Sequence, residues 1–384
     1  MPESENYLQN FAIDESGMPS SRSPWAETWH RLRRNRMAFT GLVIFVLFFI
    51  AAIIGLAVTS GPHPIVDPAR VRLEEKLRPP LSPPKRNVLK REELPALGIY
   101  VLGTDDLGRD VFARMLQGAW VSLTVGFVAV GIAVGIGILL GGIAGYYGQR
   151  FLHLGHIVFW LLTVTAGVLF ILGNWMTSGI AAILAGIVLV WHHRGERTPA
   201  WLRWTRRPAL QVDALIMRIV DIMLCFPSFF LILTVVALLP PSIYNIMVII
   251  GLTSWMGTAR FVRAEFLSLR EQDFVAAAEA LGVSDRRIIF RHILPNAAAP
   301  VLVSATLGIA SALLTEAGLS FLGFGVPPPH ATWGNILSDG KDFIFDAPWL
   351  TFAPGLVILM VVLAFNLFGE GLRDILNPKL RERG

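Results

Sequence analysis

The feature that constrains this chain most is a series of apolar runs, each near twenty residues long. A helix rises about 1.5 Å per residue and the hydrocarbon layer of a bilayer is about 30 Å thick, so such a run can cross a membrane. Two shorter runs, His156–Gly173 and Met176–Trp191, predict a transmembrane or re-entrant hairpin. The six longer runs are Ala38–Thr59, Val121–Tyr146, Ile219–Leu239, Ile243–Ala264, Ala297–Phe324 and Trp349–Phe368.

Composition supports a membrane protein and excludes several other classes. Of the 384 residues, 54% are hydrophobic and only 16% are charged, which is too apolar for an ordinary soluble domain. The single cysteine, Cys225, excludes an intramolecular disulfide and a cysteine metal cluster. The basic residues lie beside apolar runs, a pattern that favours membrane orientation over nucleic-acid binding.

The distribution of Lys and Arg predicts that both termini are cytoplasmic. Five arginines precede the first run, five lie between residues 192 and 213, six lie between 260 and 296, and four basic residues follow the last run. An even number of predicted spans separates each cluster from the next, so all four clusters fall on the same side of the membrane. By the positive-inside rule, this is the cytoplasmic side. The segment 60–120 carries ten basic residues and eight acids, but it is too long for the rule to apply, and we expect an external loop.

A charged segment, "FVAAAEALGVSDRRIIF", separates two of the long apolar runs. Its apolar residues recur at near-helical spacing, which predicts a cytoplasmic helical hairpin with a break at Gly282. Ser284 is expected to cap the second helix, and Pro295 to end it and start the next span. The alternative is an ordinary loop between two spans.

Several motifs resemble one known family. The order Ala277-Ala278, Gly282, Leu294-Pro295 resembles the "EAA" loop of ATP-binding-cassette importer permeases. Further stretches resemble the second permease subunit of dipeptide, oligopeptide and nickel importers. They are "WHRLRRNRMAFTGLVIF" at 29–45, "GTDDLGRDVFARMLQGAWVSL" at 103–123, "MRIVDIMLCFPSF" at 217–229, "SWMGTARFVRAEFLSLRE" at 254–271, "EAGLSFLGFGVPPP" at 316–329, "TWGNIL" at 332–337 and "AFNLFGEGLRDILNPKL" at 364–380.

The resemblance implies a transport subunit and its partners. It implies an all-α polytopic membrane protein with the six-helix core of a type I importer permease, here with an inserted hydrophobic hairpin. The implied partners are a second permease, two cytoplasmic ATPases, an extracytoplasmic binding protein and membrane lipid, with no nucleic acid. Peptide is the expected substrate, and nickel or another small solute is the alternative. The implied ATPase-coupling residues are Ala277, Ala278, Glu279, Leu281, Gly282, Arg286, Leu294 and Pro295.

The chain departs from the family pattern in two places. Ala276 occupies the motif's glutamate position and Glu279 follows three residues later, so docking to the ATPase is expected to differ in detail. The second departure is the segment 150–211. The expected division of the chain is a cytoplasmic tail at 1–37, a first span at 38–59, an external loop at 60–120, the core at 121–149 and 212–384, and the insertion at 150–211.

Some residues within the spans suggest packing or a pathway. Span 121–146 carries small-xxx-small glycine spacings, which predict close contact with another helix. Pro227 is expected to kink its helix, and an intrahelical pair is expected between Arg218 and Asp221. Glu316 lies deep in an apolar run, so it should face a helix partner or an aqueous pathway. Pro227 and Glu316 are therefore candidates for the translocation path.

The sequence does not indicate an enzyme, a metal site or a cofactor. It contains no GxxxxGK[ST] phosphate loop, no nucleophile elbow and no evident catalytic dyad. "TDD" at 104–106 with Asp110 is interpreted as structural rather than as a cation site. Two rival hypotheses are a stand-alone channel or secondary transporter, and a membrane enzyme that uses the four histidines of the insertion, His153, His156, His192 and His193.

Overall fold

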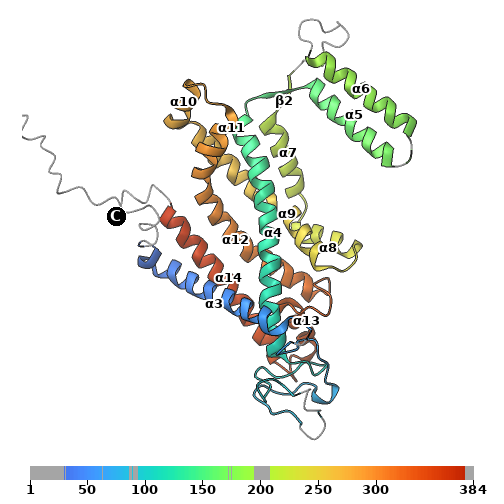
Figure 1. Cartoon of the computed structure of the whole chain (residues 1–384), viewed down its shortest axis with the longest axis vertical. Helices are drawn as coiled ribbons and strands as arrows, with labels where there is room; N and C mark the ends of the chain where they lie inside the picture. The colour runs from blue at the N-terminus through green and yellow to red at the C-terminus, as the bar shows by residue number, and fades with distance from the viewer. Residues whose placement is uncertain are drawn as a thin grey trace, which may run out of the picture.

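The computed structural model describes residues 30, 32–62, 64–85, 89, 94–171, 173, 175–193 and 208–376. This part of the chain is helical except for one short ribbon and a folded loop region (Figure 1). The elements are α3 (Arg36–Thr59), η2 (Leu73–Glu75), α4 (Val111–Tyr147), β1 (Phe151–His153), α5 (Leu154–Ile171), α6 (Trp175–His193), β2 (Pro208–Gln211), α7 (Val212–Leu224), α8 (Ser228–Leu238), α9 (Ile243–Arg270), α10 (Asp273–Ala280), α11 (Asp285–Ile288), η6 (Ile289–Ile293), α12 (Leu294–Phe321), α13 (Trp333–Gly340), η7 (Lys341–Phe343) and α14 (Trp349–Leu376).

Five helical segments in the described residues are long and apolar enough to cross a membrane. The pair α7–α8 would make a sixth, although its two halves meet at a 77° bend. These segments confirm the predicted all-α polytopic fold. The five are Arg36–Thr59, Val111–Tyr147, Ile243–Arg270, Asp285–Phe321 and Trp349–Ile375.

The most extensive helix contact in the core joins α4 to α9, and glycine makes its close approach possible. A Cβ atom added at Gly141 would lie 2.4 Å from the carbonyl oxygen of Ala259, which is far inside van der Waals contact. Gly137 and Gly145 meet α9 equally closely, so the predicted role of the glycines in packing is confirmed for these three. Gly131 and Gly135 lie on a different face, where an added Cβ would meet nothing within 4 Å.

Helix α4 begins ten residues before the apolar run that predicted it. Its first turn is fixed by Asp110, whose carboxylate accepts hydrogen bonds from the backbone N–H groups of Phe112 at 2.9 Å and Ala113 at 3.4 Å. A capped polar turn of this kind carries no hydropathy signal. The expected loop 60–120 is therefore helical from Val111 onward.

The expectation that Pro295 ends a helix is wrong. The chain runs as one helix from Asp285 to Phe321, and Pro295 lies in the first turn of α12. The preceding π-helix η6 widens the hydrogen-bonding pattern by one residue. Because a proline has no N–H to donate, this altered turn lets the helix continue through it.

The chain breaks at Pro227, between α7 and α8, so the predicted kink is confirmed as a full break. The predicted pair of Arg218 with Asp221 is wrong. Asp221 instead pairs with Arg260 on α9 at 2.5 Å, and Asp213 pairs with Arg263, also on α9. The neighbouring helix thus supplies a closer cation than the next turn of the same helix.

Two regions extend from this core. Residues 64–85 and 94–110 form, with α13 and η7, a folded region that we call the cap; it lies at the lower end of the molecule in Figure 1. At the other end, α10 and α11 lie over the ends of α4 and α9, and α5 and α6 project sideways. The strands β1 and β2 pair antiparallel at the base of this projection.

Candidate functional site

The segment predicted to couple to an ATPase folds as a short helical hairpin, which we call the coupling segment (residues 265–295). Helix α10 ends in a left-handed turn at Gly282, where φ is +72°. The N–H of Gly282 donates to the carbonyl of Glu279 at 2.9 Å, and the N–H of Val283 donates to that of Ala278 at 3.1 Å. This pair of bonds is a Schellman motif, which favours glycine because φ is positive. The predicted break is therefore confirmed, and Ser284 occupies the N-cap position of α11 without a side-chain hydrogen bond to the helix.

One side of the coupling segment is buried against the core. Val275 and Ala278 from α10, with Ile288 and Ile293 from the second arm, belong to one hydrophobic cluster. Phe266 of α9 completes the same cluster, so both arms pack against the end of the transmembrane bundle.

The other side carries apolar side chains that this chain leaves uncovered. Leu281, at the tip, is 83% exposed, and Phe290 and Phe274 are also exposed. Exposed large apolar side chains make the coupling segment a candidate interaction surface.

Polar contacts attach the coupling segment to the end of α4. Asp285 accepts a hydrogen bond from the Tyr146 hydroxyl at 3.2 Å and pairs with Arg150 at 2.8 Å. Arg270, at the end of α9, donates to the backbone carbonyl of Tyr146 at 2.9 Å. The segment is thus attached to α4 in addition to α9 and α12, the two helices that it connects.

The structure brings most of the predicted coupling residues to the outer face. Ala278 is buried in the hydrophobic cluster between the coupling segment and the core, and Leu294 is half-buried. The exposed members are Ala277, Glu279, Leu281, Gly282, Arg286 and Pro295. Phe290 is also exposed, although the sequence motif did not single it out. The only sequence signal for it was its place in the helical pattern of "RRIIF".

The two candidate pathway residues lie in different surroundings. Pro227 is exposed at the break before α8. Glu316 is buried; it accepts a hydrogen bond from the Ser320 hydroxyl at 2.7 Å and lies 3.4 Å from the Ser122 hydroxyl. Ser122 also accepts from the backbone N–H of Trp333, so Glu316 faces a helix partner and joins α4, α12 and α13.

The "TDD" motif forms a structural ion network in the cap. Asp105 is fully buried and pairs with Arg109 at 2.7 Å and Arg114 at 2.6 Å. Both arginines also reach Asp339 of α13. These contacts confirm the structural interpretation, because the carboxylate of Asp105 is occupied by two guanidinium groups and two backbone N–H groups. The partner Asp339 was not foreseen, since it is more than 200 residues away in the sequence.

Burial affects the other acids of the motif. Desolvation raises the pKa of Asp110, against the effect of the two backbone N–H groups that its carboxylate accepts. Desolvation also raises the pKa of Asp106, and the neighbouring charges of Asp105 and Asp339 add to that rise.

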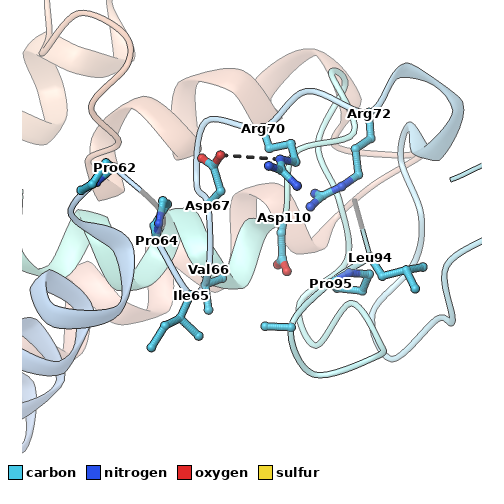
Figure 2. A pocket seen from close by; sticks show the side chains of 11 residues that line it. Pro62, Pro64, Ile65, Val66, Asp67, Arg70, Arg72, Leu94, Pro95 and Asp110 are labelled. Carbon is cyan, nitrogen blue, oxygen red and sulfur yellow. Dashed lines mark ion pairs between the residues drawn. The ribbon is translucent and has the colours of Figure 1, made fainter. Parts of the chain in front are cut away.

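Two hollows open on the cap. The smaller, of about 210 Å³, is lined by apolar residues and by the charged side chains of Asp67, Arg70, Arg72 and Asp110. Figure 2 shows them around the hollow with the Asp67–Arg70 ion pair, which measures 3.7 Å. The larger, of about 520 Å³, lies beside Asp106 and Asp339 and the prolines at 327–329.

No group of three or more His, Cys, Asp or Glu side chains in the described residues is placed to hold a metal ion. The side chains of the four histidines predicted for the rival enzyme, His153, His156, His192 and His193, lie outside the described residues. The free cysteine Cys225 is exposed at the end of α7.

Comparison with known proteins identifies the family. Residues 198–382 match the family described as "Binding-protein-dependent transport system inner membrane component", and residues 23–80 match "N-terminal TM domain of oligopeptide transport permease C". The chain is 36% identical over 359 residues to a dipeptide transport system permease protein of Alkalihalophilus pseudofirmus, covering 94% of this chain and 91% of that protein.

Two further relatives agree. An oligopeptide transport system permease protein of Bacillus subtilis is 31% identical, with 94% of this chain and 92% of that protein covered. A dipeptide transport system permease protein of Haemophilus influenzae is 34% identical, with 94% and 97% covered. The chain therefore belongs to the binding-protein-dependent transport system permeases and is a multi-pass inner-membrane transport subunit of the same type as these permeases, not an enzyme.

Proposed function

We propose that this protein is the second permease subunit of an ATP-driven importer of di- or oligopeptides. The relatives named as dipeptide and oligopeptide permeases support the peptide substrate. In this proposal the chain forms half of the translocation path, and a second, related permease forms the other half. A binding protein delivers peptide from outside, and two cytoplasmic ATPases supply the energy. Nickel or another small solute is the alternative substrate.

The coupling segment is the proposed contact with an ATPase. The observation that carries this proposal is the exposed apolar tip at Leu281, mounted on a hairpin whose opposite side is buried in the core. Gly282 keeps the turn compact, and Glu279 is exposed beside it. Because Glu279 is three residues past the motif's usual glutamate position, we expect it to supply the acidic contact here.

The continuous helix from Asp285 to Phe321 gives a direct route for coupling. Its 37 residues span about 55 Å at 1.5 Å per residue. A movement of the coupling segment would therefore be transmitted to the region around Glu316 through this one helix. ATP performs work in this scheme because the closed ATPase pair binds one conformation of the permeases better than the other.

The proposed orientation places both termini and the coupling segment in the cytoplasm. It follows from the clusters of Lys and Arg, and it places the cap outside the cell. The cap would then face the binding protein. The proposed division into tail, first span, external loop, core and insertion keeps the sequence boundaries, with the loop ending where α4 begins.

The test is whether the tip of the coupling segment holds the ATPases. Leu281→Glu places a charge where an apolar side chain is already exposed, so folding should be unaffected. We expect the variant to insert normally, to lose at least tenfold of the co-purifying ATPase and to lose ATP-driven uptake of a labelled dipeptide. Gly282→Glu should have the same effect.

The matched control is Phe345→Glu, which charges a side chain that is 96% exposed in the loop between η7 and α14. It should retain the ATPases. If Leu281→Glu and Gly282→Glu both retain ATPase and uptake, the coupling assignment is wrong. Uptake that needs no ATP would instead favour a channel or secondary transporter, and uptake of Ni²⁺ without dipeptide would favour the alternative substrate. Loss of uptake on joint replacement of the four insertion histidines would favour the enzyme rival.

A further inference from the structure

Helices α5 and α6 form a unit that is separate from the core. They pack mainly against each other and join the rest of the chain through the antiparallel strands β1 and β2. The two ends of the unit meet, since the N–H of Val212 donates to the carbonyl of Arg150 at 3.1 Å. The residues on either side of the unit are thus joined to each other directly, and the unit projects sideways from α4 (Figure 1).

The sequence of this unit is apolar on all sides. No Asp, Glu, Lys or Arg occurs between residues 151 and 193. A helix without a charged or polar face belongs in a protein interior or in a membrane. Helices α5 and α6, with 18 and 19 residues, are shorter than the five candidate spans of the core, but their lengths fall at the lower end of the range that crosses a hydrocarbon layer of about 30 Å.

Three hydroxyl groups in the described part of the unit form hydrogen bonds within it. Thr163 and Thr165 donate to carbonyls one turn earlier in α5, each at 2.8 Å. Ser178 of α6 donates to the carbonyl of Ala166 of α5, also at 2.8 Å. Hydroxyls that bond only inside the hairpin need no water, as a hydrocarbon environment requires.

The inner and outer faces differ in side-chain size. The contact between the two helices buries small side chains, including Ala166, Ala181 and Ala185. The outer surface carries large apolar side chains on several faces, namely Leu161, Val164, Phe170, Ile180, Ile183, Leu184, Ile187 and Val190. Because these surround the hairpin, a single docking partner would cover only part of them.

The sequence that follows the hairpin has a composition typical of a segment at a membrane surface. The segment between α6 and β2 contains five arginines, at positions 194, 197, 203, 206 and 207, together with Trp201 and Trp204. Arginine is attracted to anionic lipid headgroups, and tryptophan favours the interface. This composition, in the sequence directly after α6, favours lipid over protein as the surroundings of the hairpin.

We propose that α5 and α6 form a transmembrane hairpin outside the transport core, with its outer surface covered by lipid acyl chains. Its turn, around Gly173, would lie on the same side of the membrane as the cap. The strands β1 and β2 would tether it to α4 and α7 at the level of the coupling segment. The inference rests on the membrane location of the chain and not on the peptide substrate or the ATPase contact.

The first experiment locates the turn. In a Cys225→Ser background, single cysteines are introduced as Met176→Cys at the turn, Leu97→Cys in the cap and Glu271→Cys beside the coupling segment. Intact cells are treated with a membrane-impermeant maleimide before and after permeabilisation. Met176→Cys should react from the same side as Leu97→Cys, and Glu271→Cys should react from the opposite side.

The outcomes separate this proposal from the proposed orientation. The spanning hairpin would be overturned if position 176 reacted from the same side as position 271. It would also be overturned if position 176 reacted from neither side. If positions 97 and 271 exchange sides while 176 still follows 97, the hairpin stands and the orientation of the whole chain is wrong.

The second experiment identifies what covers the outer face. A spin label at Ile183→Cys, in purified permease complex reconstituted into phosphatidylglycerol-containing vesicles, should collide several-fold more often with oxygen than with a water-soluble nickel complex. Low collision rates with both would show a protein cover, and frequent collisions with nickel would show water; either would overturn the proposal.

A matched pair of substitutions provides an independent check. Gly179→Leu adds a side chain where a Cβ meets nothing within 4 Å, whereas Ala181→Leu enlarges a buried position between the helices. Lipid accommodates the first but the hairpin cannot accommodate the second. Only Ala181→Leu should therefore increase protease cleavage of the hairpin, and equal cleavage of Gly179→Leu would contradict a lipid-facing surface.

Discussion

The cap and the coupling segment, at opposite ends of the core, are held in contrasting ways. In the cap, Asp105 is fully buried and Arg114 is 4% exposed, and their pairing extends to Asp339 on a distant helix. In the coupling segment the corresponding pair, Arg150 with Asp285, is largely exposed to solvent. The cap is therefore held by buried ion pairs, whereas the coupling segment leaves apolar side chains exposed, which we propose bind another protein.

The difference between the two regions arises from the desolvation of buried charges. A buried ion pair costs several kcal/mol if one partner is removed, because the other charge stays buried. An exposed pair contributes about 0–1 kcal/mol. Changes in the cap should thus act on stability, and changes at the coupling tip should act on partner binding.

The largest effect is expected from Asp105→Asn. This change removes the charge that Arg109 and Arg114 share, although both arginines retain Asp339. We expect a loss of about 3 kcal/mol in the free energy of unfolding, measured as a lower thermal midpoint and a lower yield of detergent-solubilised protein. The control Asp67→Asn breaks an exposed pair and should change the midpoint little. Equal effects of the two variants would remove the distinction between buried and exposed charges.

A smaller effect on stability is expected at the turn of the coupling segment. Gly282→Asn should be tolerated, because asparagine enters the left-handed region readily, whereas Gly282→Val should strain the backbone by about 1–3 kcal/mol. No atom crowds this position, so conformation alone distinguishes the variants. Binding of the ATPases, measured by co-purification, should fall for valine and persist for asparagine. Equal binding would show that the turn geometry does not matter.

At neutral pH the smallest effect is expected from the buried tyrosine of the cap, which acts only on alkaline titration. Burial raises the pKa of Tyr100 from 10.0 to about 12. Between these values the unfolded chain loses the phenolic proton and the folded cap retains it, so stability should fall as pH rises from about 10 to about 12. Tyr100→Phe should lessen this loss, and its own cost should be small because the hydroxyl has no hydrogen-bond partner among the described atoms. Identical alkaline profiles of the two proteins would contradict the assignment.

Local sequence patterns predicted the helical spans, the break at Pro227 and the turn at Gly282. Each depends on residues close together in the chain: hydropathy over one helix length, a missing N–H, or the tolerance of glycine for positive φ. The exposed tip at Leu281 followed from the family motif rather than from hydropathy.

Long-range partners could not be predicted in the same way. The bonds of Arg114 to Asp339 and of Asp221 to Arg260 join helices that are far apart in sequence. Spacing within one helix favoured Arg218 for Asp221, but the packing of α7 on α9 decided otherwise. The continuation through Pro295 was missed because the π-helix that accommodates it has no simple sequence signature.

The most direct test of the account is photocrosslinking from the tip of the coupling segment. A photoreactive amino acid replaces Leu281 in the full transporter in native membranes, and the covalent product is identified by mass spectrometry. We expect an adduct with the ATPase subunit, with a yield that changes when ATP is added; the same residue at Phe345 should give no such adduct. If position 281 formed adducts only with lipid, or formed none with any other protein, the coupling role of the segment would be contradicted.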